Sequence, residues 1–418
     1  MDAGVGVIHL GTRTDGEPYH YPLDGVANFG ITLVGSSGSG KTHLIRQLVH
    51  GFYEHGITTF IIDPHGDLED IPGVPREKMN TVRCVYDGTG GTINPLRVYP
   101  ETGPYIAGEA FLDAIASLLP RVGNRQISLL RKLLQQSFHD AGLFEDDPTT
   151  WGRRSPTIDD VLALGEQWLE VIRNPAKTKQ DDPGGSVVDK GDEPPMGDPV
   201  ATGDLDPSEI HANAEPAAEG DEALLDQDDL LPKNLSINQA RMESALEILE
   251  DLQRSKLFGE DSMTIRQGCV NRFDVFSLGL AHLGLLSYLL IDRALNYAMR
   301  TAPTLDPVRP RIILVLDEGK LVKRVSTGLL SPLNRSASEG RKYGLGVVTG
   351  VQRASHLTED VKDNSSLVVL LRQNPHNVKE TARRFNVEAA ALSRITPRRD
   401  GLFTLDQTGY QRVAIRSQ

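Results

Sequence analysis

Residues 35–42 read GSSGSGKT, and they follow the apolar run FGITLVG at residues 29–35. The eight residues fit the pattern G-x-x-x-x-G-K-[ST] of a phosphate-binding loop. The apolar run before the loop is typical of a buried strand, and residues 41–56 have apolar side chains at helical spacing. The glycines therefore lie at a strand-to-helix turn, where free backbone N–H groups face an anion.

This loop predicts a site for ATP and Mg²⁺. Lys41 is expected to reach the β- and γ-phosphates, and the hydroxyl of Thr42 is expected to bind Mg²⁺. A turn without a ligand is the alternative, and the correct flanking strand and helix argue against it. The residues predicted to bind the nucleotide are Gly35, Ser36, Ser37, Gly38, Ser39, Gly40, Lys41 and Thr42.

A second apolar run, RIILVLDEGK at residues 311–320, supplies the acids that hydrolysis needs. Asp317 is expected to hold Mg²⁺, and Glu318 is expected to polarise the attacking water. An Asp-Glu pair at a strand end also favours ATPases in which one strand separates the loop strand from the acidic strand. This arrangement argues against GTPases and small-molecule kinases.

The rest of the chain divides by its pattern of apolar residues. Strands and helices alternate at first, with strands expected at 57–63 and 81–87, which predicts an α/β fold with a mostly parallel sheet. The predicted segments are the first half of the core (1–99), a helical insertion (100–173), an acidic linker (174–232), more of the helical insertion (233–270) and the second half of the core (271–418).

Charge is unevenly distributed along the chain. The net charge is −13, but residues 181–229 hold sixteen Asp and Glu and a single Lys. Residues 233–418 carry 27 Lys and Arg against 19 Asp and Glu. We expect the acidic segment to be disordered, since it has too few apolar residues to offset chain entropy. The basic part suits a polyanion partner, although ordinary surface arginines would give the same balance.

The composition also indicates in which cellular compartment the protein is expected. Two cysteines form no disulfide framework, and no signal peptide opens the chain. The longest apolar run, residues 276–291, contains His282 and glycines and is short for a bilayer span. We therefore expect no membrane span and a cytoplasmic location.

Several motifs together resemble the HerA/FtsK superfamily of DNA-pumping ATPases, and most of all HerA and the coupling proteins of type IV secretion. The resemblance implies a RecA-like P-loop NTPase core with a helical insertion. It extends over most of 1–170 and 235–418. The motifs are GSSGSGKT, IIDPHGD (61–67), INPL (93–96), LVLDE (314–318), GRKYGLGVVTGVQR (340–353) and LTEDVKDNSSLVVLLRQNPHNV (357–378).

The resemblance assigns two further catalytic residues. Gln352 matches the residue that senses the γ-phosphate, with a polar strand cap as the alternative. Arg341 matches the arginine that reaches the ATP of a neighbouring subunit; Arg335 and Arg353 are its rivals, and a surface ion pair is the alternative.

The tip of the second strand carries two more polar residues. Asp63 is expected to orient a water molecule or Lys41. His65 is expected to cap the loop rather than to act directly in catalysis.

The same resemblance implies a homo-hexameric ring that binds DNA through phosphate contacts, with a nuclease or a secretion system as a possible partner. The expected DNA contacts are Lys320, Lys323, Arg324 and the loop 354–365. Too few residues precede the P-loop for the β-barrel usual in HerA, and the membrane helices usual in coupling proteins are not expected.

Three hypotheses follow from these expectations. The first is an ATP-dependent DNA translocase or helicase. The second is a motor that moves DNA or protein at a membrane in a secretion-like system. The third is a nucleotide-dependent switch with little hydrolysis, and the presence of Lys41, Asp317 and Glu318 argues against it.

Overall fold

The computed structural model of the protein describes residues 6–119, 122–174, 239–328 and 330–415. The acidic linker predicted at 174–232 lies outside these residues, except for Asn174. The chain divides into two compact units, one of residues 1–165 with 240–418 and one of residues 166–239. The first unit contains the P-loop.

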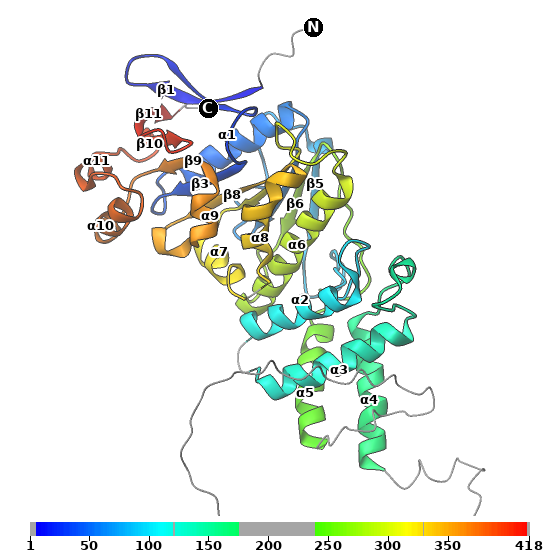
Figure 1. Ribbon diagram of the computed structural model, residues 1–418. Coiled ribbons are helices and arrows are strands. Elements are labelled where there is room, and N and C mark those ends of the chain that lie inside the picture. Colours follow the sequence, from blue (N-terminus) through cyan, green and yellow to red (C-terminus); the bar gives the residue numbers. More distant parts are fainter. Residues whose placement is uncertain (1–5, 120–121, 175–238, 329, 416–418) are drawn as a thin grey trace, which may run out of the picture. The chain divides into compact units, whose positions relative to one another are not determined.

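One 11-stranded sheet forms the centre of the described part of the chain, in the order β2-β1-β11-β10-β9-β3-β8-β7-β4-β6-β5 (Figure 1). The strands are β1 (Val7–Arg13), β2 (Pro18–Pro22), β3 (Gly30–Val34), β4 (Thr58–Asp63), β5 (Met79–Arg83), β6 (Val270–Asp274), β7 (Ile312–Leu316), β8 (Leu345–Val351), β9 (Ser365–Leu370), β10 (Asp400–Leu405) and β11 (Gln411–Ile415).

The strands from β9 to β5 are parallel, and those from β2 to β9 pair antiparallel. The predicted α/β fold with a mostly parallel sheet is therefore confirmed. β8 lies between β3 and β7, so one strand separates the P-loop strand from the acidic strand, as expected. Both of these strands are fully buried, which explains why they read as continuous apolar runs.

Helices lie on both faces of the parallel strands, and further helices of the described residues belong to the helical insertion. They are α1 (Lys41–Glu54), α2 (Gly103–Leu118), α3 (Asn124–Asp140), α4 (Ile158–Arg173), α5 (Gln239–Arg254), α6 (Leu280–Thr301), α7 (Gly319–Val325), α8 (Pro332–Glu339), α9 (Glu359–Asp363), α10 (Pro375–Arg384) and α11 (Ala389–Ser393). None of these helices has the length and hydropathy needed to cross a bilayer.

Side-chain alternation along the strands separates the two faces. Ile31, Leu33 and Ile61 share one buried cluster with the apolar residues of α1. Phe60 points to the other face, where its ring lies 5.7 Å from that of Tyr297 in α6. α1 begins directly after the P-loop, which follows β3. Because the apolar side of α1 is buried against the sheet, the first turn of the helix and the P-loop are held at the carboxyl end of β3.

The predicted helical insertion contains α2, α3, α4 and α5. The salt bridge between Arg131 of α3 and Glu109 of α2 joins two of these helices, with the Nε of Arg131 at 2.5 Å from Oε1 of Glu109. α5 begins at Gln239, within the segment 233–270 predicted to continue the helical insertion.

Candidate nucleotide-hydrolysis site

The P-loop connects β3 to α1 with a backbone that requires glycine. Gly38 and Gly40 have φ values of 73° and 110°, in the left-handed region that other residues rarely adopt. A side chain at Gly35 would place its Cβ 2.4 Å from Oγ of Ser39. The fixed glycines of the motif therefore follow from the conformation of the loop.

Lys41 lies within the P-loop. Its Nζ donates to the carbonyl oxygens of Gly35, at 2.9 Å, and Ser36, at 3.3 Å. Burial lowers the pKa of Lys41, and the carboxylates of Asp317 and Glu318 oppose that shift. An ammonium group held only by carbonyl oxygens is suited to the stronger acceptors of a triphosphate.

Thr42 and Asp317 meet across the site. The hydroxyl of Thr42 donates to Oδ2 of Asp317 at 2.8 Å. Burial raises the pKa of Asp317 to about 6, against the opposing effects of Thr42 and Lys41. Oδ1 of Asp317 is buried and has no hydrogen-bond partner among the described residues. A hydroxyl and a carboxylate with an unused oxygen are the ligands that Mg²⁺ takes in such sites, so these residues fit the ion.

Glu318 follows Asp317 and is held at both of its oxygens. Oε2 accepts from Nε2 of His65 at 2.8 Å, and Oε1 accepts from the backbone N–H of Lys320 at 2.9 Å, which caps α7. Burial alone would raise the pKa of Glu318, but these hydrogen bonds and the positive charge of Lys320 lower it. The carboxylate is therefore ionised at neutral pH, as a general base must be.

His65 thus makes a contact that the sequence did not predict. We expected it only to cap its own loop. Its ring instead reaches from the end of β4 to the glutamate after β7, because β4 and β7 are parallel neighbours. A histidine at the tip of one strand and a glutamate at the tip of the next is the pattern that could have indicated this contact.

Asp63 is held in a buried ion pair, whereas its predicted orientation of a water molecule stays a prediction. Its Oδ2 accepts from Nε of Arg272 at 2.7 Å and from the N–H of Leu68 at 3.1 Å. Asp63 and Arg272 are 2% and 3% exposed. The carboxylate is therefore engaged in a buried ion pair and makes no hydrogen bond to Lys41, which contacts Gly35 and Ser36 instead.

Gln352 lies one residue after β8, exposed at the same edge of the sheet as Asp317. This position suits a residue that senses the γ-phosphate. That role of Gln352 stays a prediction. The rival Arg353 is also exposed at this edge, next to Gln352.

Arg341 lies at the other edge of the sheet. It belongs to the short 3₁₀ helix Gly340–Tyr343, which precedes β8. Its guanidinium lies 3.6 Å from Asp306 and 5.7 Å from the ring centroid of Phe29, which precedes β3. Since the P-loop follows the carboxyl end of β3, Arg341 is remote from the P-loop of its own chain. Arg335, the other rival, lies 3.9 Å from Glu339.

The C-terminal part of the chain supplies contacts to the P-loop that we did not predict. The N–H and hydroxyl of Ser36 donate to the carbonyl of Arg372, at 2.8 and 2.9 Å. The N–H of Arg398 donates to the carbonyl of Ser39 at 3.0 Å, and its Nε donates to that of Gly38 at 3.3 Å. β9 pairs with β3, so a residue just after the apolar run of β9 is expected near the loop, whereas no local pattern indicates Arg398.

The residues predicted to grip DNA differ in their surroundings. Lys320 and Lys323 are exposed. Arg324 is partly buried and donates to the carbonyl of Leu118, so it is tied to α2. In the loop 354–365, Lys362 forms ion pairs with Glu359 and Asp363. Within the described residues, Lys320 and Lys323 are thus the better placed of these cations.

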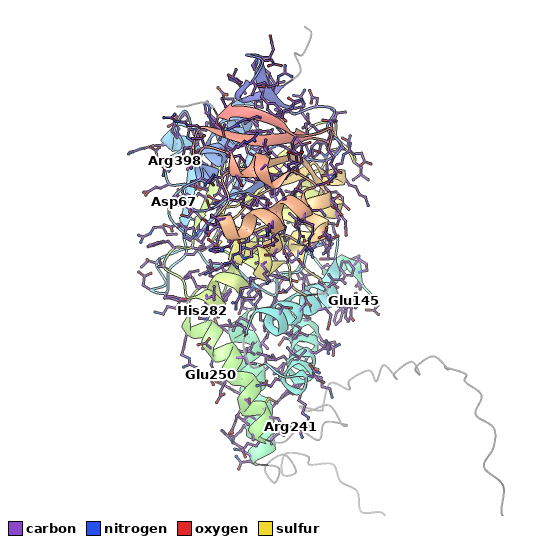
Figure 2. The ribbon with its side chains drawn as sticks, turned by 90° about the vertical axis from the view of Figure 1, so that its left-hand side faces the viewer. Asp67, Glu145, Arg241, Glu250, His282 and Arg398 are labelled. Atoms are coloured by element: carbon purple, nitrogen blue, oxygen red, sulfur yellow. The ribbon has the colours of Figure 1, made fainter. Side chains whose placement is uncertain are left out.

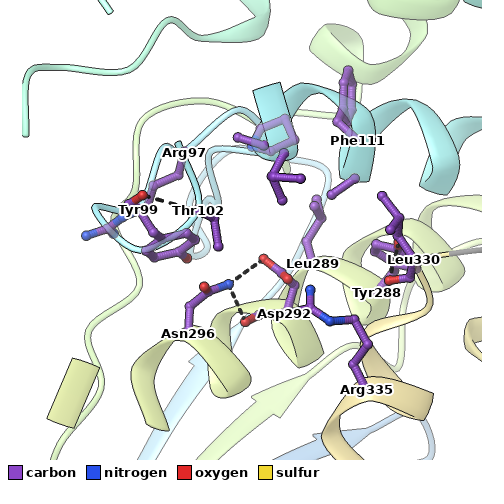
Figure 3. A pocket seen from close by; sticks show the side chains of 14 residues that line it. Arg97, Tyr99, Thr102, Phe111, Tyr288, Leu289, Asp292, Asn296, Leu330 and Arg335 are labelled. Atoms are coloured by element: carbon purple, nitrogen blue, oxygen red, sulfur yellow. Dashed lines mark hydrogen bonds between the residues drawn. The ribbon is translucent and has the colours of Figure 1, made fainter. Parts of the chain in front are cut away.

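A separate pocket lies beside α2, α6 and α8 (Figure 3). Asp292 lines it, and its Oδ2 accepts from the amide of Asn296 at 2.9 Å. Burial raises the pKa of Asp292 to about 6, against the opposing charge of Arg335. The pocket lies apart from the P-loop and makes no contact with its residues.

The fold and the arrangement of Lys41, Thr42, Asp317 and Glu318 are those of a P-loop ATPase. Residues 8–107 match the family described as the central domain of the helicase HerA. No curated protein sequence matches the chain.

Solved structures share the fold over nearly the whole chain. VirB4 of Thermoanaerobacter pseudethanolicus matches with a TM-score of 0.67 and 18% identity, over 100% of this chain and 98% of that one. The bacterial conjugative coupling protein TrwB, in an unbound form, matches with a TM-score of 0.56 and 14% identity, over 98% and 89% of the two chains. TrwB in complex with ADP and Mg²⁺ matches with a TM-score of 0.56 and 14% identity, over 93% and 86%. These structures share the fold of the chain, and the match of residues 8–107 agrees with the predicted resemblance to HerA.

Proposed function

We propose that the protein is an ATP-hydrolysing motor that moves DNA. The observation that carries the proposal is the hydrogen bond between Thr42 and Asp317, which joins the P-loop to the strand that Asp317 and Glu318 follow. Binding of ADP and Mg²⁺ by TrwB supports the same ligands here.

The chain's own residues would divide the work as follows. Lys41 and the N–H groups of the P-loop would hold the phosphates, and Thr42 and Asp317 would hold Mg²⁺, which would supply positive charge against the phosphates. Glu318 accepts a proton from the water whose oxygen attacks the γ-phosphorus, while the bond to the leaving ADP oxygen breaks. Gln352 senses the γ-phosphate from the same edge of the sheet.

Arg341 completes the site from a neighbouring subunit. Its place at the far edge of the sheet supports action in trans, since it is remote from the P-loop of its own chain. An arginine in trans requires a closed assembly, and we propose a homo-hexameric ring.

DNA is the proposed partner because residues 233–418 are net basic and Lys320 and Lys323 are exposed near the acidic strand. Binding through phosphates is independent of sequence and weakens steeply with salt. A nuclease is a possible partner protein. The two cysteines are buried and unpaired, which is consistent with the cytoplasm.

The similarity to VirB4 and to a conjugative coupling protein favours a second candidate. In this alternative, the same ATPase drives the transfer of DNA or protein in a secretion-like system at a membrane. A membrane-bound partner would then hold the ring.

Hydrolysis of ATP with and without linear duplex DNA, at low and moderate salt, tests these functions. We expect DNA to stimulate hydrolysis and salt to weaken the stimulation. Lys41→Ala should abolish hydrolysis, and Glu318→Gln should slow it by about 100-fold or more while ADP still binds. Hydrolysis indifferent to DNA, together with sedimentation of the protein with membranes, would favour the secretion motor. Binding of ADP without hydrolysis in any assembly state would leave a nucleotide switch.

A further inference from the structure

Arg398 contacts the P-loop from the segment between α11 and β10. Its backbone N–H and its Nε donate to the carbonyls of Ser39 and Gly38. Its φ of 60° lies in the left-handed region, which a non-glycine residue adopts only when its surroundings impose it. The contact with the loop therefore fixes both the backbone and the side chain of this residue.

The guanidinium of Arg398 has N–H donors without a hydrogen-bond partner among the described residues. Arg398 is exposed, as its position in Figure 2 shows. The backbone hydrogen bond already joins this segment to the loop, and the Nε contact is long at 3.3 Å. The terminal nitrogens make no hydrogen bond or ion pair among the described residues. A planar cation with free donors at the rim of a nucleotide site suggests contact with the ligand.

The position of Arg398 indicates which half of the nucleotide it contacts. Lys41, Thr42 and Asp317 occupy the phosphate and Mg²⁺ end of the site. Arg398 binds carbonyl oxygens of Gly38 and Ser39, which point away from the N–H groups that cradle the phosphates. It therefore lies outside the cradle, and the part of a nucleotide that a phosphate cradle leaves outside is the nucleoside.

We propose that Arg398 is a nucleotide-binding residue that packs its guanidinium on the purine ring. This inference rests on the proposed binding of ATP. A flat cation attracts the face of an aromatic ring, so stacking uses the plane of the guanidinium as well as its charge. The contact would be equal for ATP and ADP, because both carry the same nucleoside.

Calorimetric titration with ADP and with inorganic pyrophosphate, both in Mg²⁺, separates the two halves of the ligand. We expect Arg398→Ala to weaken ADP about tenfold and to leave pyrophosphate affinity unchanged. Arg398→Lys should weaken ADP binding by about the same factor, because lysine keeps the positive charge but lacks the planar guanidinium group. Arg399→Ala is the matched control, since Arg399 is an exposed neighbour whose side chain makes no hydrogen bond or ion pair with the described residues of the loop.

Equal losses for ADP and pyrophosphate would overturn the inference, because they would mean that Arg398 supports the loop or binds phosphate. Unchanged ADP affinity in Arg398→Ala would also overturn it. Neither result would affect the proposed ATPase function. That function fails separately if the unaltered protein does not bind ADP, or if Lys41→Ala binds it equally well.

Discussion

Glu318 serves two purposes at once. It caps α7 through Oε1, and its Oε2 accepts from His65. A base that must approach one water molecule benefits from a fixed position, since small displacements cost large factors in rate. The hydrogen bond from His65 therefore makes this histidine a positioning residue for Glu318 within the proposed reaction.

We expect His65→Ala to lower kcat about tenfold and to leave ADP affinity within about twofold, because Glu318 loses a restraint while the P-loop is untouched. His65→Gln should recover part of the rate, since its amide can donate to the same carboxylate. Steady-state ATP hydrolysis and ADP titration measure the two quantities. An unchanged kcat in His65→Ala, or a matching loss of ADP affinity, would contradict this role.

The order of the strands brings Asp317 to Thr42. β8 lies between β3 and β7, and its Gly350 packs directly against the side chain of Asp317. A Cβ at this position would lie 2.3 Å from Oδ1 of Asp317. The absence of a side chain in β8 thus creates the space in which the Mg²⁺ carboxylate lies.

Gly350→Ala should displace Asp317 and lower the gain in ADP affinity that Mg²⁺ provides, by about tenfold or more. ADP titrations with Mg²⁺ and with a chelator measure this gain. Gly152→Ala is the control, because a Cβ there meets no atom within 4 Å. A normal Mg²⁺ effect in Gly350→Ala would mean that Asp317 does not depend on this space.

The elements around the P-loop could be predicted from sequence because each has a local signal. Residues 29–56 and 311–320 contain the apolar patterns and fixed residues that define β3, α1 and β7. The partners of Asp63 and Arg398 could not be predicted in this way. Asp63 pairs with Arg272 across β4 and β6, and Arg398 meets the P-loop from far along the chain, so only the folded sheet joins them.

The free energy of unfolding should depend on pH through Asp292, which lines the pocket beside α2, α6 and α8. Its pKa rises from 3.8 to about 6 on folding, so the stabilising contribution belongs to the protonated form. That contribution is complete below pH 3.8 and is lost as the pH rises through about 6. At pH 8 the charged, partly buried carboxylate therefore costs up to about 3 kcal/mol.

Asp292→Asn stays neutral at every pH and can still accept from Asn296. We expect its free energy of unfolding to exceed that of the unaltered protein by about 1–3 kcal/mol at pH 8, with the difference shrinking towards pH 4. Urea denaturation at both pH values measures it. Equal free energies of unfolding of the two proteins at pH 8 would mean that the charged form of Asp292 does not destabilise the folded protein.

The pairing of β3 has a consequence for synthesis of the chain. Both neighbours of the P-loop strand, β8 and β9, come more than 300 residues after it. At about 5–20 residues per second, a ribosome would make β3 roughly 15–60 s before either neighbour emerges. During that interval the strand and its loop have no sheet to join. The nucleotide site is thus completed only after β8 and β9 have been made, although its defining motif is synthesised before both of them.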